Sequence, residues 1–143
     1  STIGGVKTAA EILNLVGQRY EKHILNGIAR HDPTLAVEIK NLMFTFEDLI
    51  LLDDRSIQRV LKEAETRDLA MALKACSEEL KKKILNNMSK RAADMILEEL
   101  EYMGAVRLRE VEEVQQKIVD IVRRLEEDGE IVISRRTQEE QLV

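Results

Sequence analysis

Hydrophobic residues recur every three to four positions along most of this chain, which is the spacing of an amphipathic α-helix. The clearest case is the stretch 89–104, SKRAADMILEELEYMG. Ser89 is a favoured N-cap residue, since its hydroxyl can accept a hydrogen bond from a free N–H group of the first turn. Gly104 suits a helix C-terminus because it adopts positive φ without a Cβ penalty. We therefore predict a helix between Ser89 and Gly104.

This predicted helix has two different sides when it is wound at about 100° per residue. The hydrophobic side comprises Ala92, Ala93, Ile96, Leu100 and Met103. The opposite side, called the charged ridge below, comprises Lys90, Arg91, Asp94, Glu98 and Glu101, with Glu99 on its flank. Periodicity alone favours a solvated face with local pairs such as Lys90–Asp94. Our hypothesis is that the charged ridge is the working surface of the protein.

The same periodicity predicts helices along the rest of the chain, at 6–17, 18–29, 33–42, 47–52, 53–63, 67–74, 78–86 and 109–128. Their expected N-caps include Asp32 (followed by Pro33), Asp53, Thr66 and Ser77. Residues 131–133 are expected to dock as a short tail, and the polar residues from Ser134 onward to fray. The fold class predicted is all-α, an armadillo-like right-handed helical superhelix in two subdomains joined by a hinge.

The two subdomains are expected at 1–42 and 47–143, on either side of Met43-Phe44-Thr45-Phe46, called the MFTF joint below. The joint holds both phenylalanines of the chain, and helix propensity drops around Thr45. A core cluster in an ordinary turn explains this pattern equally well. The first subdomain resembles one armadillo unit, whose apolar face needs a neighbour. We expect that face to include Ile12, Val16, Leu35 and Ile39.

Composition narrows the functional classes. The chain is 44% hydrophobic and 34% charged, so it is expected to fold, and its net charge of −5 disfavours nucleic acid as a partner. A single cysteine, Cys76, fits a reducing compartment. No apolar run reaches the roughly 18 residues that span a bilayer. The chain begins at Ser1 without an initiator Met, which we interpret as a piece of a longer protein.

Residues that could perform catalysis or bind metal are few. His23 and His31 are eight positions apart and have no second ligand pair, and Cys76 has no histidine nearby in the sequence. Asp53-Asp54 lacks the alternating ligands and the glycine of a calcium loop. The sequence therefore predicts no enzyme, no metal site and no cofactor.

Three stretches, MFTFEDL (43–49), DDRSIQRVL (53–61) and NMSKRAADMILEELEYMGAVR (87–107), together with LEEDGEIVI near the end, resemble the FliG family of flagellar motor switch proteins. The resemblance covers essentially the whole chain and matches the C-terminal part of that family. It implies a rotor protein that receives torque from the stator and passes on the direction switch in chemotaxis. The family's torque-bearing charges correspond to Lys74, Arg91, Glu98, Glu99 and Arg107. Ala105 departs from the family, which usually has Pro there, and this relaxes the φ restriction in the connector.

The resemblance also implies partners and a location. The expected partners are the cytoplasmic loop of the stator protein MotA, the switch proteins FliM and FliN, neighbouring FliG copies in a ring, and the membrane ring protein FliF through an N-terminal part absent from this chain. The expected location is the flagellar basal body, at the cytoplasmic face of the inner membrane. Without the resemblance, the competing hypothesis is a helical-repeat adaptor that binds a partner helix in its groove.

Overall fold

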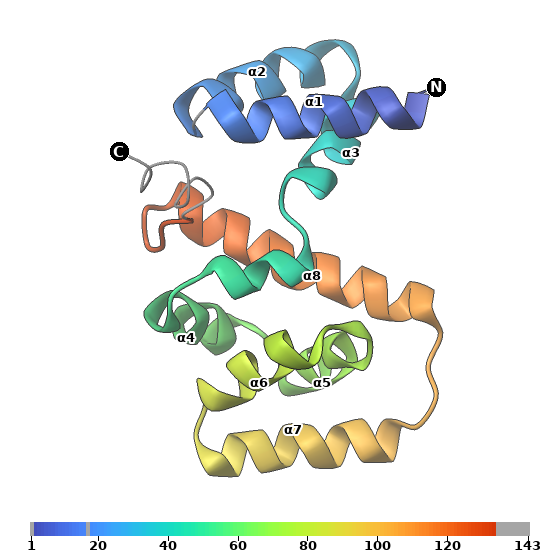
Figure 1. The fold of residues 1–143 in the computed structure, drawn as a ribbon, viewed down its shortest axis with the longest axis vertical. Helices are drawn as coiled ribbons and strands as arrows, with labels where there is room; N and C mark the ends of the chain where they lie inside the picture. The colour runs from blue at the N-terminus through green and yellow to red at the C-terminus, as the bar shows by residue number, and fades with distance from the viewer. Residues whose placement is uncertain (1, 17, 134–143) are drawn as a thin grey trace. The chain divides into compact units, whose positions relative to one another are not determined.

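The computed structural model describes the backbone of residues 2–16 and 18–133 and the side chains of residues 4–14 and 20–133. Every regular element in these ranges is helical, which confirms the all-α prediction (Figure 1). None of the helices in the described ranges is long and apolar enough to cross a membrane. The described residues form two compact units that divide between Thr45 and Phe46, inside the MFTF joint. The predicted frayed tail from Ser134 lies outside the described residues.

Unit 1 consists of three mutually packed helices, α1 (Thr2–Val16), α2 (Gln18–His31) and α3 (Pro33–Met43). The N-cap prediction for α3 is confirmed, because Asp32 Oδ1 accepts a hydrogen bond from the Leu35 N–H (3.0 Å) and Pro33 occupies the first turn. α1 begins four residues earlier than predicted and runs through Gly4 and Gly5. The core of unit 1 contains Val6, Ala10, Leu13, Leu25, Ile39 and Met43.

The predicted uncovered face of unit 1 is only partly correct. Ile39 is 2% exposed and Leu35 packs against the same core, so both stabilise the unit from inside. Ile12 is 54% exposed, as predicted, whereas the side chain of Val16 lies outside the described set. The 3–4 spacing identified apolar positions on α3 but could not show which of them its own neighbouring helices cover. Exposed apolar side chains are also present at Ile24, Val37 and Leu42.

Unit 2 contains a longer series of elements around one core. In order, these are η1 (Phe46–Leu51), α4 (Asp54–Glu63), α5 (Thr66–Ala72), η2 (Leu73–Ala75), α6 (Glu78–Asn86), α7 (Lys90–Met103) and α8 (Leu108–Glu127). α5 contacts both α7 and α8, and α8 also packs on α4, η1 and η2. Figure 1 shows α7 beneath α5 and α6, joined to α8 by an extended connector. The fully buried side chains of unit 2 include Leu49, Ile57, Val60, Leu80, Ile84 and Leu125.

The capping residues of unit 2 mostly follow the sequence prediction. Asp53 accepts from the Ser56 N–H (2.8 Å), Ser77 from the Leu80 N–H (3.1 Å) and Ser89 from the Ala92 N–H (3.1 Å). The backbone hydrogen bond at Ser56 also lowers the pKa of Asp53. The prediction for Thr66 is wrong: Glu65 occupies the N-cap position of α5 without a side-chain hydrogen bond, and Thr66 is already helical.

Two segments of unit 2 depend on contacts between residues far apart in sequence. η1 is a 3₁₀-helix whose end is capped by Lys83, which donates to the carbonyls of Ile50 (2.9 Å) and Leu52. Gly129, at φ 76°, ends α8, and the extended tail after it buries Ile131 and Ile133, as predicted. The Arg59 guanidinium binds Glu130 of this tail (3.1 Å) and Glu63 (2.9 Å). These tertiary contacts hold the end of η1 and the tail that follows α8.

Candidate functional site

The charged ridge lies on the exposed side of α7. The side chains of Lys90, Arg91, Asp94, Glu98 and Glu101 are all exposed, whereas Ile96 on the opposite side is 2% exposed. Arg91 and Glu98 are seven residues apart, which corresponds to about 10 Å along the helix axis. The predicted division of this helix into two sides is therefore confirmed. Glu99 is half-buried and lies between them, on the predicted flank.

The described part of the chain offers the charges of the site no ionic partner. Across the described residues, no ion pair forms at Lys74, Arg91, Glu98, Glu99 or Arg107. The pair Lys90–Asp94, which a merely solvated face would favour, is also absent from the ion pairs of this part of the chain. The ridge thus presents both signs of charge to solvent, and none of the described residues neutralises them by an ion pair. Such charges are available to an external partner.

The five predicted contact residues come from three neighbouring parts of unit 2. Arg91, Glu98 and Glu99 lie on α7 itself. Lys74 is exposed in η2, the turn that follows α5, and α5 packs directly on α7. Arg107 is exposed at the N-cap position of α8, at the far end of the connector from α7. One helix therefore holds three of the charges, the turn that follows its packing partner holds Lys74, and the far end of its connector holds Arg107.

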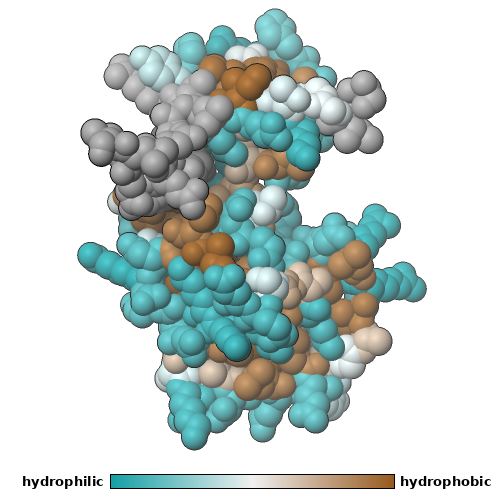
Figure 2. All heavy atoms as spheres, in the orientation of Figure 1, coloured by the Kyte–Doolittle hydropathy of each residue, from teal (hydrophilic) through white to brown (hydrophobic). Residues whose placement is uncertain are grey.

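The sequence analysis missed an apolar component of the ridge. Met95 is 51% exposed, Leu97 42% and Tyr102 89%. Met95 follows Arg91 by four residues and Tyr102 follows Glu98 by four, so each lies next to a charge on the helix surface. Figure 2 shows teal side chains projecting on both sides of a brown patch where α7 lies at the bottom of the view. The 3–4 spacing already indicated this, because it places Met95 and Tyr102 outside the buried set centred on Ile96.

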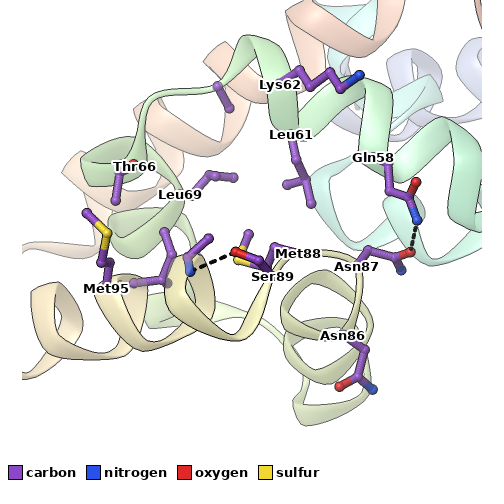
Figure 3. A pocket seen from close by; sticks show the side chains of 13 residues that line it. Gln58, Leu61, Lys62, Thr66, Leu69, Asn86, Asn87, Met88, Ser89 and Met95 are labelled. Atoms are coloured by element: carbon purple, nitrogen blue, oxygen red, sulfur yellow. Dashed lines mark hydrogen bonds between the residues drawn. The ribbon is translucent and has the colours of Figure 1, made fainter.

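A groove of about 510 Å³ lies beside the first turns of α7 (Figure 3). Its walls come from the ends of α4 and α6 and the starts of α5 and α7. Gln58 and Asn87 form a hydrogen bond across it (3.1 Å). The apolar lining residues are Leu61, Ala64, Leu69, Met88, Ala92, Met95 and Ile96. A partner that contacts Arg91 would therefore meet an adaptable, methionine-containing hollow next to it.

The connector between α7 and α8 depends on an unusual backbone conformation. Gly104 has φ 63° and ψ −148°, a region that is essentially open to glycine alone. The positive φ matches the prediction, but ψ lies outside the left-handed helical well that a typical C-cap uses. Ala105 follows in this connector, and no proline holds its φ. Gly104 is therefore the residue that directs the chain from α7 towards Arg107.

The predicted hinge residues lie where unit 1 meets unit 2 in the sequence. Met43 is the last residue of α3 and is buried, Phe44 is its extended C-cap, and Phe46 begins η1. Only Phe44 and Thr45 are non-helical. Phe44 and Phe46 are both buried, and Thr45 between them is exposed. The link between the units is thus two residues long, and both aromatic side chains of the MFTF joint are buried.

The residues considered for catalysis have environments that fit other roles. Cys76 is half-buried, and burial, with the nearby Glu47 carboxylate, raises the pKa of its thiol to about 11. Only about one thiol in 10⁴ is then ionised at pH 7, and a nucleophile needs the thiolate. His23 and His31 are exposed on α2. Within the described ranges, no group of three or more His, Cys, Asp or Glu side chains could hold a metal ion.

Comparisons with known proteins match residues 26–133 to the FliG C-terminal domain family. The flagellar motor switch protein FliG of Thermotoga maritima is 59% identical over 140 residues, covering 98% of this chain and 42% of that protein. The corresponding protein of Borreliella burgdorferi is 52% identical over 143 residues, covering 100% and 42%. The full-length FliG structure from Aquifex aeolicus superposes with a TM-score of 0.82 at 41% identity, covering 87% of this chain and 39% of that one. The chain therefore spans about two fifths of the length of these relatives.

Replacing Gly104 with alanine is expected to destabilise unit 2, because alanine must adopt a backbone conformation that costs about 1–3 kcal/mol. No atom lies within 4 Å of the position where the new Cβ would be, so the loss arises from the backbone alone. Urea unfolding of the purified chain measures it. Gly27→Ala is the matched control, since Gly27 lies inside α2 with equal space, and this change should stabilise the chain by up to about 1 kcal/mol. A Gly104→Ala variant as stable as the unmodified chain would contradict a backbone conformation that only glycine adopts without strain.

Proposed function

Because the chain belongs to the FliG C-terminal domain family, we propose that it is the torque-receiving part of a flagellar rotor, which meets the stator through the charged ridge of α7. The observation that carries this proposal is the set of exposed charges of both signs on a capped helix, without ion pairs among the described residues. The named function of the relatives, a flagellar motor switch protein, supports the same assignment. The role proposed is mechanical and not enzymatic.

The physics of exposed charges suits a surface that must bind and release a passing partner repeatedly. An exposed ion pair contributes about 0–1 kcal/mol, so each contact is weak and readily broken. Electrostatic attraction nevertheless acts over about 10 Å at 0.1 M salt and orients the partner before contact. Alternating signs along the ridge favour one register of the opposing surface over others, because like charges that face each other repel. The ridge can therefore transmit force with little risk of stalling.

We assign the stator contact to Lys74, Arg91, Glu98, Glu99 and Arg107. The opposing surface is then the cytoplasmic loop of the stator protein MotA, with acidic groups facing the basic residues and basic groups facing Glu98 and Glu99. The remaining motor partners are FliM and FliN for switching, and FliF through a part of the protein that this chain does not contain. This assignment locates the chain at the cytoplasmic face of the inner membrane, in the flagellar basal body.

The MFTF joint is proposed as the hinge for direction switching. Its non-helical link is only Phe44 and Thr45, so a change in a few backbone dihedrals can reorient one unit against the other. Phe44 and Phe46 bury large aromatic surfaces, and two alternative packings of these rings would give two discrete states. Such a change would turn the charged ridge relative to the stator.

Unit 1 is proposed to contact a neighbouring copy in the rotor ring. Its exposed apolar side chains, on all three helices, include Ile12, Ile24, Val37 and Leu42. An armadillo unit buries such a face by stacking on another unit. The competing role, a general adaptor for partner helices, has no support from the relatives of Thermotoga maritima, Borreliella burgdorferi and Bacillus subtilis, which are named as motor switch proteins.

Reversing the ridge charges is expected to impair rotation more than neutralising them. Arg91→Glu should reduce swimming speed and stall torque more than Arg91→Ala, because reversal replaces an attraction by a repulsion. The Glu98→Lys/Glu99→Lys double variant should behave likewise, and matching charge swaps on the stator loop should restore rotation. Bead assays on single motors measure the torque.

Lys82→Glu is the matched control for this test, since Lys82 is exposed on α6 and is not part of the assigned contact. It should leave torque near the unmodified value. If Arg91→Glu also leaves torque unchanged while motors assemble normally, the ridge is only solvated and the proposed contact is wrong.

The hinge proposal predicts more than one distance between the units in solution. Spin labels at Glu11→Cys and Lys82→Cys, in a Cys76→Ser background, should give at least two distance populations by pulsed electron resonance. Phe44→Ala should change their ratio by removing one of the alternative ring packings. Labels at Lys82→Cys and Glu112→Cys, both in unit 2, should give one narrow distance. A single narrow distance between the units, unaffected by Phe44→Ala, contradicts a hinge.

The ring proposal predicts that the purified chain associates through unit 1. The sedimentation coefficient should rise with concentration, and Ile12→Lys should reduce that rise by placing a charge in the apolar contact. Asn26→Lys, which adds the same charge at an exposed polar position of α2, should have a smaller effect. A chain that remains monomeric at every concentration tested would rule out this use of the face.

A further inference from the structure

We propose that Gln115 is a positioning residue that fixes the turn carrying Lys74. This inference rests on the stator contact assigned to Lys74 above. Gln115 lies on α8, forty-one residues after Lys74 in the sequence. Its Nε2 group donates to the carbonyl of Ala72 (2.9 Å) and to the carbonyl of Ala75 (2.7 Å). These two carbonyls flank Lys74 on either side.

The two hydrogen bonds use the full donor capacity of the side chain amide. A glutamine NH₂ group carries two N–H bonds and the carbonyl oxygens are acceptors, so one orientation of the amide satisfies both partners. Ala75 ends η2, where a helix carbonyl has no partner inside the helix, whereas Ala72 ends α5 and is also the N-cap of η2, so its carbonyl accepts from Gln115 at the junction of two short helices. Gln115 therefore provides, from a distant helix, a donor to each of the two carbonyls that flank Lys74.

The other end of the turn is held from a different direction. Glu47 accepts from the Ser77 N–H (2.6 Å) through Oε1 and from the Ser77 hydroxyl (2.9 Å) through Oε2. Leu73, at the centre of the turn, is buried, whereas Lys74 beside it is exposed. The backbone around Lys74 is thus fixed at three points while its charged side chain stays free to meet a partner.

The Gln115 contact also links the separate parts of the proposed stator surface. α8 begins directly after Arg107, so the helix that holds the Lys74 turn also starts at another basic residue of the site. Gln115 fixes the position of the Lys74 backbone relative to the N-terminal end of α8. A charge displaced by about 1 Å changes which opposing group it meets, and a positioned contact depends on such distances.

The test compares Gln115→Met with Gln116→Met in the full chain. Methionine has nearly the same length and helix propensity as glutamine but no N–H donor, so α8 should remain intact. Gln116 is a matched control on the same helix, because its amide donates only to Asp120 (3.2 Å), one turn along α8. Each variant should fold, and each lacks a single side-chain amide.

Hydrogen exchange of the purified chain gives the first readout. Gln115→Met should make the amides of residues 73–76 exchange on the order of tenfold faster, the factor expected when hydrogen bonds worth about 1.4 kcal/mol are lost. Gln116→Met should leave those amides unchanged. Unchanged exchange at residues 73–76 in Gln115→Met overturns the proposal.

Stall torque in cells that express each variant as the sole copy gives the second readout. Gln115→Met should lower torque in the unmodified background and cause no additional loss in a Lys74→Ala background, because it acts through Lys74. A loss of torque that adds fully to that of Lys74→Ala shows a general structural role for Gln115. That result overturns the inference about Gln115 but leaves the proposed stator surface standing. If Lys74→Ala and Arg91→Glu both leave torque intact, the proposed stator surface itself is wrong and the inference falls with it.

Discussion

The structure depends on one constraint at α7: the helix must be rigid although the charges on its outer side form no ion pair with any described residue. A helix of fourteen residues is close to the length at which isolated helices are marginal in water. Its stability therefore comes from packing Ile96 and its neighbours against α5 and from the hydrogen bond between Ser89 and Ala92. These contacts all lie on one side and at one end, and among the described residues the charged side has no ionic partner.

The separation of a packed side from a charged side explains how charges that make only weak contacts can occupy defined positions. Local ion pairs at i,i+4 would stabilise the helix slightly, by about 0.2–0.5 kcal/mol each, but would also neutralise the surface. α7 achieves its order through apolar packing and a cap instead, and in the described part of the chain its charges stay unpaired. The exposed Met95 and Tyr102 add short-range contact between those charges. Electrostatics can then orient a partner at long range, while dispersion acts only at contact.

Sequence reasoning succeeded where the relevant forces are local. The hydroxyl or carboxylate caps at Asp53, Ser77 and Ser89 each act on an N–H three residues away, so their spacing is visible in the sequence. The two sides of α7 followed from its period for the same reason. Glu65 occupies the N-cap position predicted for Thr66, and α5, which packs on α7 and α8, begins without a side-chain cap. Leu35 and Ile39 were assigned to an open face because periodicity finds apolar positions but not their partners.

The remaining features of the site involve contacts between residues that are distant in sequence. Glu47 reaches Ser77, Lys83 reaches the end of η1, and Gln115 reaches the turn around Lys74. None of these partners is within a helical turn of the group it binds, so no local pattern reveals it. All three supply hydrogen-bond partners to backbone or capping groups where short helices end.

Unit 2 is built from short helices and therefore has many such ends, each with backbone groups that need a partner. A lone turn can satisfy these groups with water, but it then moves freely. Where a side chain from another helix takes the place of water, the turn becomes part of the rigid body. Lys74 and Arg107 lie at helix ends, unlike Arg91 and Glu98 within α7. Their positions consequently depend on how α8 packs, and α8 is the element that converts separate charged segments into one surface.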